Sequence, residues 1–126
     1  MLSVLDTSIL IADRPAPIDG DLGVSVVSIA ELQFGVLVAS DDDQRARRLA
    51  RLSAILGTFD PLPVDSAVAS SYGQLAAATL RAGRKASARR LDLMIAATAH
   101  AHGARLVTAN PDDVRHLGDL VEIVQG

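Results

Sequence analysis

Short apolar runs alternate with longer amphipathic segments along most of this chain. The runs, rich in Val and Leu, predict buried strands at Leu2–Leu5, Val24–Val27, Arg105–Thr108 and Leu120–Val124. The longer segments have apolar residues at helical spacing and predict helices at Ser8–Ala12, Ser28–Ala39, Asp41–Leu56, Ser66–Arg81 and Arg89–His102. Asp13–Gly20 contains Pro15, Pro17 and Gly20 and predicts a loop. Asp60–Val64 predicts a turn with a short strand, and Asn110–Asp112 predicts the start of a short helix.

This order of elements predicts an α/β fold. Strands that are apolar on both faces are typical of a parallel sheet covered by helices on both sides. The chain has 126 residues, which is the size of one domain. We therefore expect a single three-layer α/β/α domain over residues 1–126, with a parallel sheet of about five strands.

Composition excludes several classes of protein. Hydrophobic residues make up 49% of the chain, which excludes disorder throughout, and the net charge of −3 excludes a strongly basic nucleic-acid binder. Without cysteine there is no disulfide framework, zinc ribbon or thiol catalysis, which favours a reducing cytoplasm. We expect no membrane span and no signal peptide, because apolar runs are short and Asp6 follows the first one directly.

Acidic residues follow three of the predicted strands. Asp6 ends the first strand, Glu31 lies one helical turn after the second, and Asp112 and Asp113 follow Arg105–Thr108. Ligands of open parallel sheets bind beyond the carboxyl ends of the strands. The sequence therefore predicts that these carboxylates lie at the same edge of the sheet.

A further acid, Asp92, lies in a helical segment that is otherwise apolar on every face. At helical spacing it shares a stripe with Ile95, Ala96 and Ala99, so we expect its side chain to point inward or at a cleft. Buried carboxylates are paired or bind a metal. Arg89, one turn upstream, is a possible partner.

The other acids also have purely structural explanations. Asp6 could serve only as a helix N-cap, and Ser28 with Glu31 forms a capping-box pattern. Asp112 and Asp113 could favour the first turn of a short helix through its dipole. A functional site therefore requires that the acids converge.

Converging carboxylates would repel one another unless a cation lay among them. Oxygen ligands without His or Cys select the hard ions Mg²⁺ or Mn²⁺. Such ions in acidic clusters activate water and hold phosphate oxygens. The reaction class that this pattern favours is phosphodiester hydrolysis.

Four segments of the chain carry a recognisable pattern: Val4–Ser8, Ser28–Gly35, Leu91–Ala99 and Gly103–Asn110. Their occurrence in this order is more specific for a protein family than any one segment alone. Together they resemble the PIN-domain ribonucleases, and within them the VapC toxins of type II toxin–antitoxin systems. The resemblance covers nearly the whole chain.

The resemblance implies a five-stranded parallel sheet and a Mg²⁺- or Mn²⁺-dependent endoribonuclease that cuts tRNA or rRNA. It also implies a homodimer and a cognate antitoxin protein that blocks the site. By position, the metal-site acids are Asp6, Glu31, Asp92 and Asp113, with Asp112 and Asn110 as alternates to Asp113. By the same resemblance, the side chains of Thr7, Thr108 and Asn110 lie near these carboxylates and support them through hydrogen bonds.

A basic segment precedes the Asp92 helix and contains no acid; its cations are Arg81, Arg84, Lys85, Arg89 and Arg90. It is either a solvated loop or a contact for RNA phosphates beside the site. The apolar segments Ile29–Val38 and Leu49–Leu56 are candidates for antitoxin docking or for core packing.

Two other function classes fit part of the pattern. A phosphoacceptor receiver domain has a similar size and strand-end Asp, but it also has paired acids after its first strand and a Lys after its last, whereas the only Lys here is Lys85. A non-catalytic RNA- or protein-binding module would need the basic segment and no metal.

Overall fold

A parallel sheet forms the centre of the protein in a computed structural model that describes residues 1–14 and 17–126. Its strands are β1 (Leu2–Leu5), β2 (Asp21–Gly23), β3 (Arg105–Thr108) and β4 (Ile123–Gln125). They pair in the order β2-β1-β3-β4, with all pairs parallel. Pro15, part of the predicted loop, lies outside the described residues.

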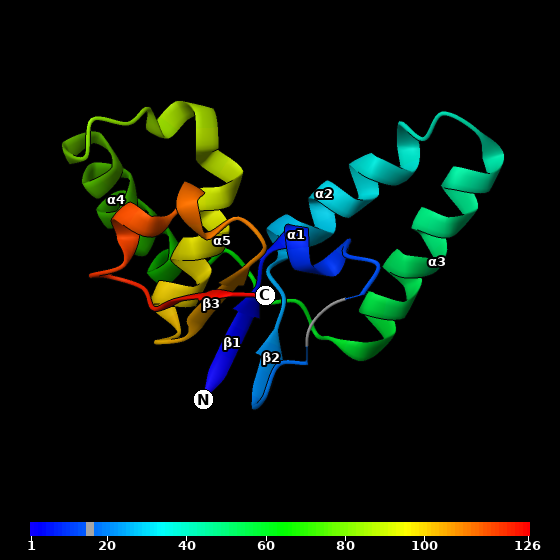
Figure 1. Cartoon of the computed structure of the whole chain (residues 1–126), viewed down its shortest axis with the longest axis horizontal. Coiled ribbons are helices and arrows are strands. Elements are labelled where there is room, and N and C mark those ends of the chain that lie inside the picture. The colour runs from blue at the N-terminus through cyan, green and yellow to red at the C-terminus, as the bar shows by residue number, and fades with distance from the viewer. Residues whose placement is uncertain (15–16) are drawn as a thin grey trace.

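Helices flank this sheet. The α-helices are α1 (Thr7–Leu10), α2 (Val26–Leu37), α3 (Asp42–Thr58), α4 (Ser66–Arg81) and α5 (Arg90–Ala101). Three short 3₁₀ helices are η1 (Ala86–Arg89), η2 (Pro111–Asp113) and η3 (Arg115–Leu117). Figure 1 shows the α4–α5 pair at one end of the molecule and the α2–α3 hairpin at the other.

The sheet is buried on both faces. Val4 of β1 and Leu106 of β3 belong to a core cluster that includes residues of α4 and α5. The next residues along the same strands, Leu5 and Val107, face the other way and pack with Ile9 of α1. This confirms the predicted α/β fold with a parallel sheet. The sheet has four strands in the described part of the chain, so five was an approximation.

The second strand was predicted in the wrong place. We expected it at Val24–Val27, but β2 ends at Gly23 and α2 begins at Val26. Ser25 is the N-cap, and its hydroxyl accepts a 3.0 Å hydrogen bond from the Val27 backbone. The segment was misleading because three of its four residues are apolar, as in a buried strand, whereas its last two residues begin a helix that is itself rich in apolar residues.

Two other predicted strands differ from the structure. The chain turns at Leu117, whose carbonyl accepts from the backbones of Leu120 and Val121, so β4 begins only at Ile123. The segment at 60–64 makes a single parallel bridge between Leu62 and Ser25 rather than a strand.

The α2–α3 hairpin has an inner and an outer apolar surface. Leu32, Val36, Leu52 and Ile55 form a small core between the two helices. Outside this core Phe34 and Leu37 of α2 are 67% and 76% exposed. Leu49 and Leu56 of α3 are also exposed, contrary to an all-core interpretation of that helix. No helix in the described ranges is both long and apolar enough to cross a bilayer.

Two leucines of α4 provide a matched test of the core. Leu75 is fully buried, whereas Leu80 is 64% exposed. We expect Leu75→Ala to lower the free energy of unfolding by about 2–5 kcal/mol, because it leaves a cavity. Leu80→Ala should change it by less than about 0.5 kcal/mol. Urea unfolding followed by circular dichroism measures both, and equal losses would contradict the packing described here.

Candidate active site

Asp6 lies where β1 ends and α1 begins, and hydroxyl groups fix its carboxylate. Oδ2 accepts hydrogen bonds from Ser8 Oγ at 2.6 Å and from Thr108 Oγ1 at 3.1 Å. The Ser8 backbone N–H reaches the same oxygen at 3.4 Å, so Asp6 also caps α1 as the structural explanation predicted. The backbone of Asp6 donates to the Val107 carbonyl at 2.8 Å and thereby ties the end of β1 to β3.

Ser8 was not identified in the sequence. Besides donating to Asp6, its hydroxyl accepts from the backbone N–H of Ala109 at 3.0 Å. It therefore joins the segments that follow β1 and β3. The available signal was its position two residues after a strand-end Asp, where an Asp side chain commonly accepts from the backbone N–H.

Asp92 lies in the first turn of α5 and is half-buried. Its stripe neighbours Ile95, Ala96 and Ala99 are fully buried, which confirms that this face of α5 points inward. Burial raises the pKa of the Asp92 carboxyl, and the charges of Asp6, Glu31 and Asp113 raise it further. The charge of Arg89 acts in the opposite direction without offsetting them.

A small cleft brings together side chains from β1, β3, α5 and η2. Its polar lining residues are Asp6, Asp92, Thr108, Asn110 and Asp113. Asp113, the predicted fourth acid, lines this cleft, and so does its alternate Asn110. Asp112 is 86% exposed and forms an ion pair with Arg115 instead.

Glu31 does not line this cleft but a separate groove, together with Thr7, although its charge is close enough to raise the pKa of Asp92, after burial and Asp6. Thr7 Oγ1 donates to Glu31 Oε1 at 2.7 Å and lies 2.9 Å from Ser28 Oγ. Because the single hydroxyl proton of Thr7 goes to Glu31, the Ser28 hydroxyl donates to Thr7. The expected capping box of Ser28 and Glu31 was wrong, since Ser25 caps α2.

The donor set is composed of carboxylate, amide and hydroxyl oxygens, the chemistry that Mg²⁺ and Mn²⁺ prefer. Among the described residues, no three acidic or histidine side chains stand close enough to enclose a metal ion in these positions. Two of the acids have other partners, since Glu31 accepts from Thr7 and Asp113 pairs with Arg89 at 3.2 Å. The residues fit a hard divalent ion in chemistry, and binding would require these two side chains to reorient.

The basic segment borders the cleft on one side. Arg89 reaches the Asp113 carboxylate, and Arg84 donates to the Asp113 carbonyl at 3.2 Å. Lys85 and Arg90 are exposed beside them. Arg81 lies apart, in a hollow on α4 near Leu120.

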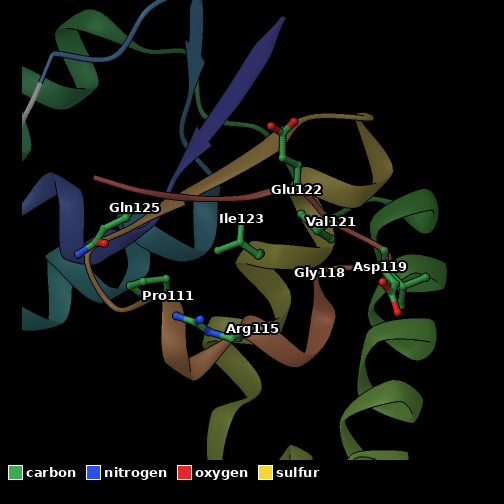
Figure 2. A pocket seen from close by; sticks show the side chains of 9 residues that line it. Pro111, Arg115, Gly118, Asp119, Val121, Glu122, Ile123 and Gln125 are labelled. Carbon is green, nitrogen blue, oxygen red and sulfur yellow. The ribbon is translucent and has the colours of Figure 1, made fainter.

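A larger groove lies along β4 and η3, outside the acidic cleft. Figure 2 shows Arg115 next to Pro111 in this groove, with Asp119, Glu122 and Gln125 around it. Its charged groups have both signs, and it contains none of the acids predicted for the site. This groove, although larger than the acidic cleft, is therefore not the place where the candidate residues meet.

The pKa of Asp92 generates a stability prediction for the protein in chelator. A carboxyl whose pKa is raised on folding destabilises the fold above that pKa, and the penalty vanishes below the unfolded value. Asp92→Asn should therefore raise the thermal unfolding midpoint at pH 7, with a gain that shrinks as the pH falls toward 3.8. Calorimetry across this pH range checks the result, with Asp112→Asn as control. An equal gain in the control would contradict it.

Comparison with known proteins places this arrangement in a family. The sequence matches the PIN domain over residues 3–120. It is 40% identical over 102 residues to Ribonuclease VapC8 of Mycobacterium tuberculosis, covering 78% of this chain and 90% of that protein. It is 31% identical over 127 residues to a tRNA(fMet)-specific endonuclease VapC of Shigella flexneri, covering 93% and 92%.

A solved structure agrees with these matches. VapBC-5 of Mycobacterium tuberculosis, a member of the VapBC family of toxin–antitoxin systems, contains a chain that superposes with a TM-score of 0.85 at 36% identity. The superposition covers 99% of this chain and 98% of that one. The chain therefore belongs to the PIN-domain family and, within it, to the VapC ribonucleases.

Proposed function

We propose that this chain is a divalent-metal-dependent endoribonuclease and the toxin of a toxin–antitoxin pair. The observation that carries the proposal is the acidic cleft, where Asp6, Asp92 and Asp113 meet from three separate segments. The pKa of Asp92, raised partly by the other acids, indicates repulsion that a bound cation would relieve. The names of the relatives support RNA as the substrate.

Asp6, Asp92 and Asp113 would hold the ion, with Glu31 joining them from its separate groove. When bound, a Mg²⁺ or Mn²⁺ ion supplies an activated water and neutralises charge on the phosphate. Ser8 and Thr108 orient Asp6 by donating to its Oδ2, which fixes the position of that carboxylate. Thr7 holds Glu31 in the same way, and Asn110 adds a neutral oxygen to the cleft wall.

The basic segment would bind the RNA backbone. Arg84, Lys85, Arg89 and Arg90 lie on or beside the rim of the cleft, which an acidic protein needs in order to attract a polyanion. The tRNA specificity in the name of the Shigella flexneri relative supports tRNA as the substrate class. Ribosomal RNA is the alternative outcome of the same experiment.

An antitoxin is the proposed protein partner, since the similar solved structure is a toxin–antitoxin complex. The exposed apolar side chains of α2 and α3, among them Phe34, Leu37 and Leu49, support the hairpin as its docking surface. The groove beside them is lined by Phe34, Val38 and also Glu31, so a segment bound there would reach the site. The homodimer and the cytoplasmic location stay predictions.

The family membership favours the nuclease over the receiver-like domain and the non-catalytic binding module. A receiver would take phosphate from acetyl phosphate at Asp6. A binding module would retain RNA without metal and produce no new RNA ends.

The nuclease proposal predicts which acids are essential. We expect Asp92→Asn to leave the protein folded and to reduce cleavage by more than about 100-fold, since even groups that only support metal ligands cost about 10–100-fold. Asp113→Asn should also reduce cleavage, whereas Asp112→Asn should not, because Asp112 is turned toward Arg115.

The measurement is sequencing of new 5′-phosphate ends in total bacterial RNA after incubation with Mn²⁺ or Mg²⁺. A sample with chelator is the control for metal dependence. Wild-type ends that persist in Asp92→Asn or in chelator would overturn the proposal.

A further inference from the structure

Arg89 forms the one ion pair that links the basic segment to the acidic cleft. Its Nη1 lies 3.2 Å from Asp113 Oδ2, and the two side chains are 37% and 47% exposed. Within residues 1–14 and 17–126, the other cations of the segment form no ion pair. Arg89 is also the last residue of η1 and the N-cap residue of α5, three positions before Asp92.

Position and charge make Arg89 the internal counter-ion of the cleft. Asp113 lines the cleft together with Asp6 and Asp92. The guanidinium of Arg89 acts on Asp92 as well, because it lowers the pKa that burial and the other acids raise. A monovalent cation thus offsets part of the negative charge that a divalent ion would neutralise.

We propose that Arg89 exchanges with the divalent ion: it pairs with Asp113 when no metal is bound and releases this carboxylate when the metal binds. The inference rests on the proposed function, because it assumes that Asp113 is a metal ligand. The released guanidinium lies among Arg84, Lys85 and Arg90, so it becomes available to an RNA phosphate at the cleft.

The exchange is favourable for two physical reasons. A half-exposed ion pair is screened by solvent, so the pair between Arg89 and Asp113 is weak enough to break. A guanidinium and a divalent ion that share one carboxylate would repel each other, so binding of the ion drives Arg89 away. The consequence is coupling: metal loading creates a free cation for the substrate.

Mn²⁺ affinity in the absence of RNA tests the exchange directly. Removing the competing cation by Arg89→Gln should tighten Mn²⁺ binding by about two- to fivefold, the range that corresponds to a partly exposed ion pair. Arg90→Gln is the matched control, because it removes the same charge from the next residue and breaks no ion pair. Titration calorimetry at one ionic strength measures both, after thermal unfolding has confirmed that each variant is folded.

A second set of variants isolates the pair. In Asp113→Asn the carboxylate that pairs with Arg89 is gone and only the longer-range effect of Arg89 on Asp92 remains, so adding Arg89→Gln should tighten Mn²⁺ binding less than it does in the wild-type background. At saturating Mn²⁺, Arg89→Gln should also cleave RNA more slowly than the wild type. Tighter metal binding together with slower cleavage is a combination that a merely structural role would not produce.

The outcomes separate the inference from the proposed function. Weaker Mn²⁺ binding by Arg89→Gln would show that Arg89 positions Asp113 for the ion, which overturns the exchange. Equal tightening in Arg90→Gln would show a general charge effect and would also overturn it. If neither the wild type nor any variant binds Mn²⁺, the proposed metal dependence itself fails.

Discussion

The parallel pairing of β1 with β3 is the constraint on which the candidate site depends. Leu5 pairs with Val107 in this ladder, so Asp6, the residue that follows β1, lies beside Thr108, the last residue of β3. The hydrogen bond between Thr108 and Asp6 is a direct result of that register. A slip of one residue would turn Asp6 away from the cleft, because it moves every side chain of β1 to the other face of the sheet.

The same pairing brings acidic side chains close together, and hydroxyl groups and one arginine bind most of these carboxylates. Acids at the ends of β1 and β3 and on α5 converge, and the pKa of Asp92 is raised by its burial and, in addition, by the charges of these acids. Ser8 and Thr108 stabilise Asp6, Thr7 stabilises Glu31, and Arg89 pairs with Asp113. These three carboxylates each have a hydrogen-bonding or ion-pairing partner. Asp92 instead has a raised pKa, which the nearby charge of Arg89 lowers only in part.

Sequence reasoning succeeded where one local signal determined the structure and failed where tertiary contacts decided. The runs at Leu2–Leu5 and Arg105–Thr108 matched β1 and β3 because buried central strands are short and apolar. The predicted strand at Val24–Val27 was wrong, since one apolar run spans the junction into α2. The resemblance favoured Asp113 over Asp112, although the spacing alone did not separate them. The pair of Asp113 with Arg89 could not be predicted, because it joins two segments that lie far apart in the sequence.

The position of Asp92 shows why stability and function oppose each other in this fold. A carboxylate on an otherwise apolar face of α5 lowers the stability of the metal-free protein, and an Asn there would remove that cost. The same charge lines the cleft with Asp6 and Asp113, where in the proposed function it would attract a cation. The buried stripe of Ile95, Ala96 and Ala99 keeps Asp92 in place despite the repulsion. The hydrophobic packing of α5 therefore maintains an arrangement of charges that would otherwise separate.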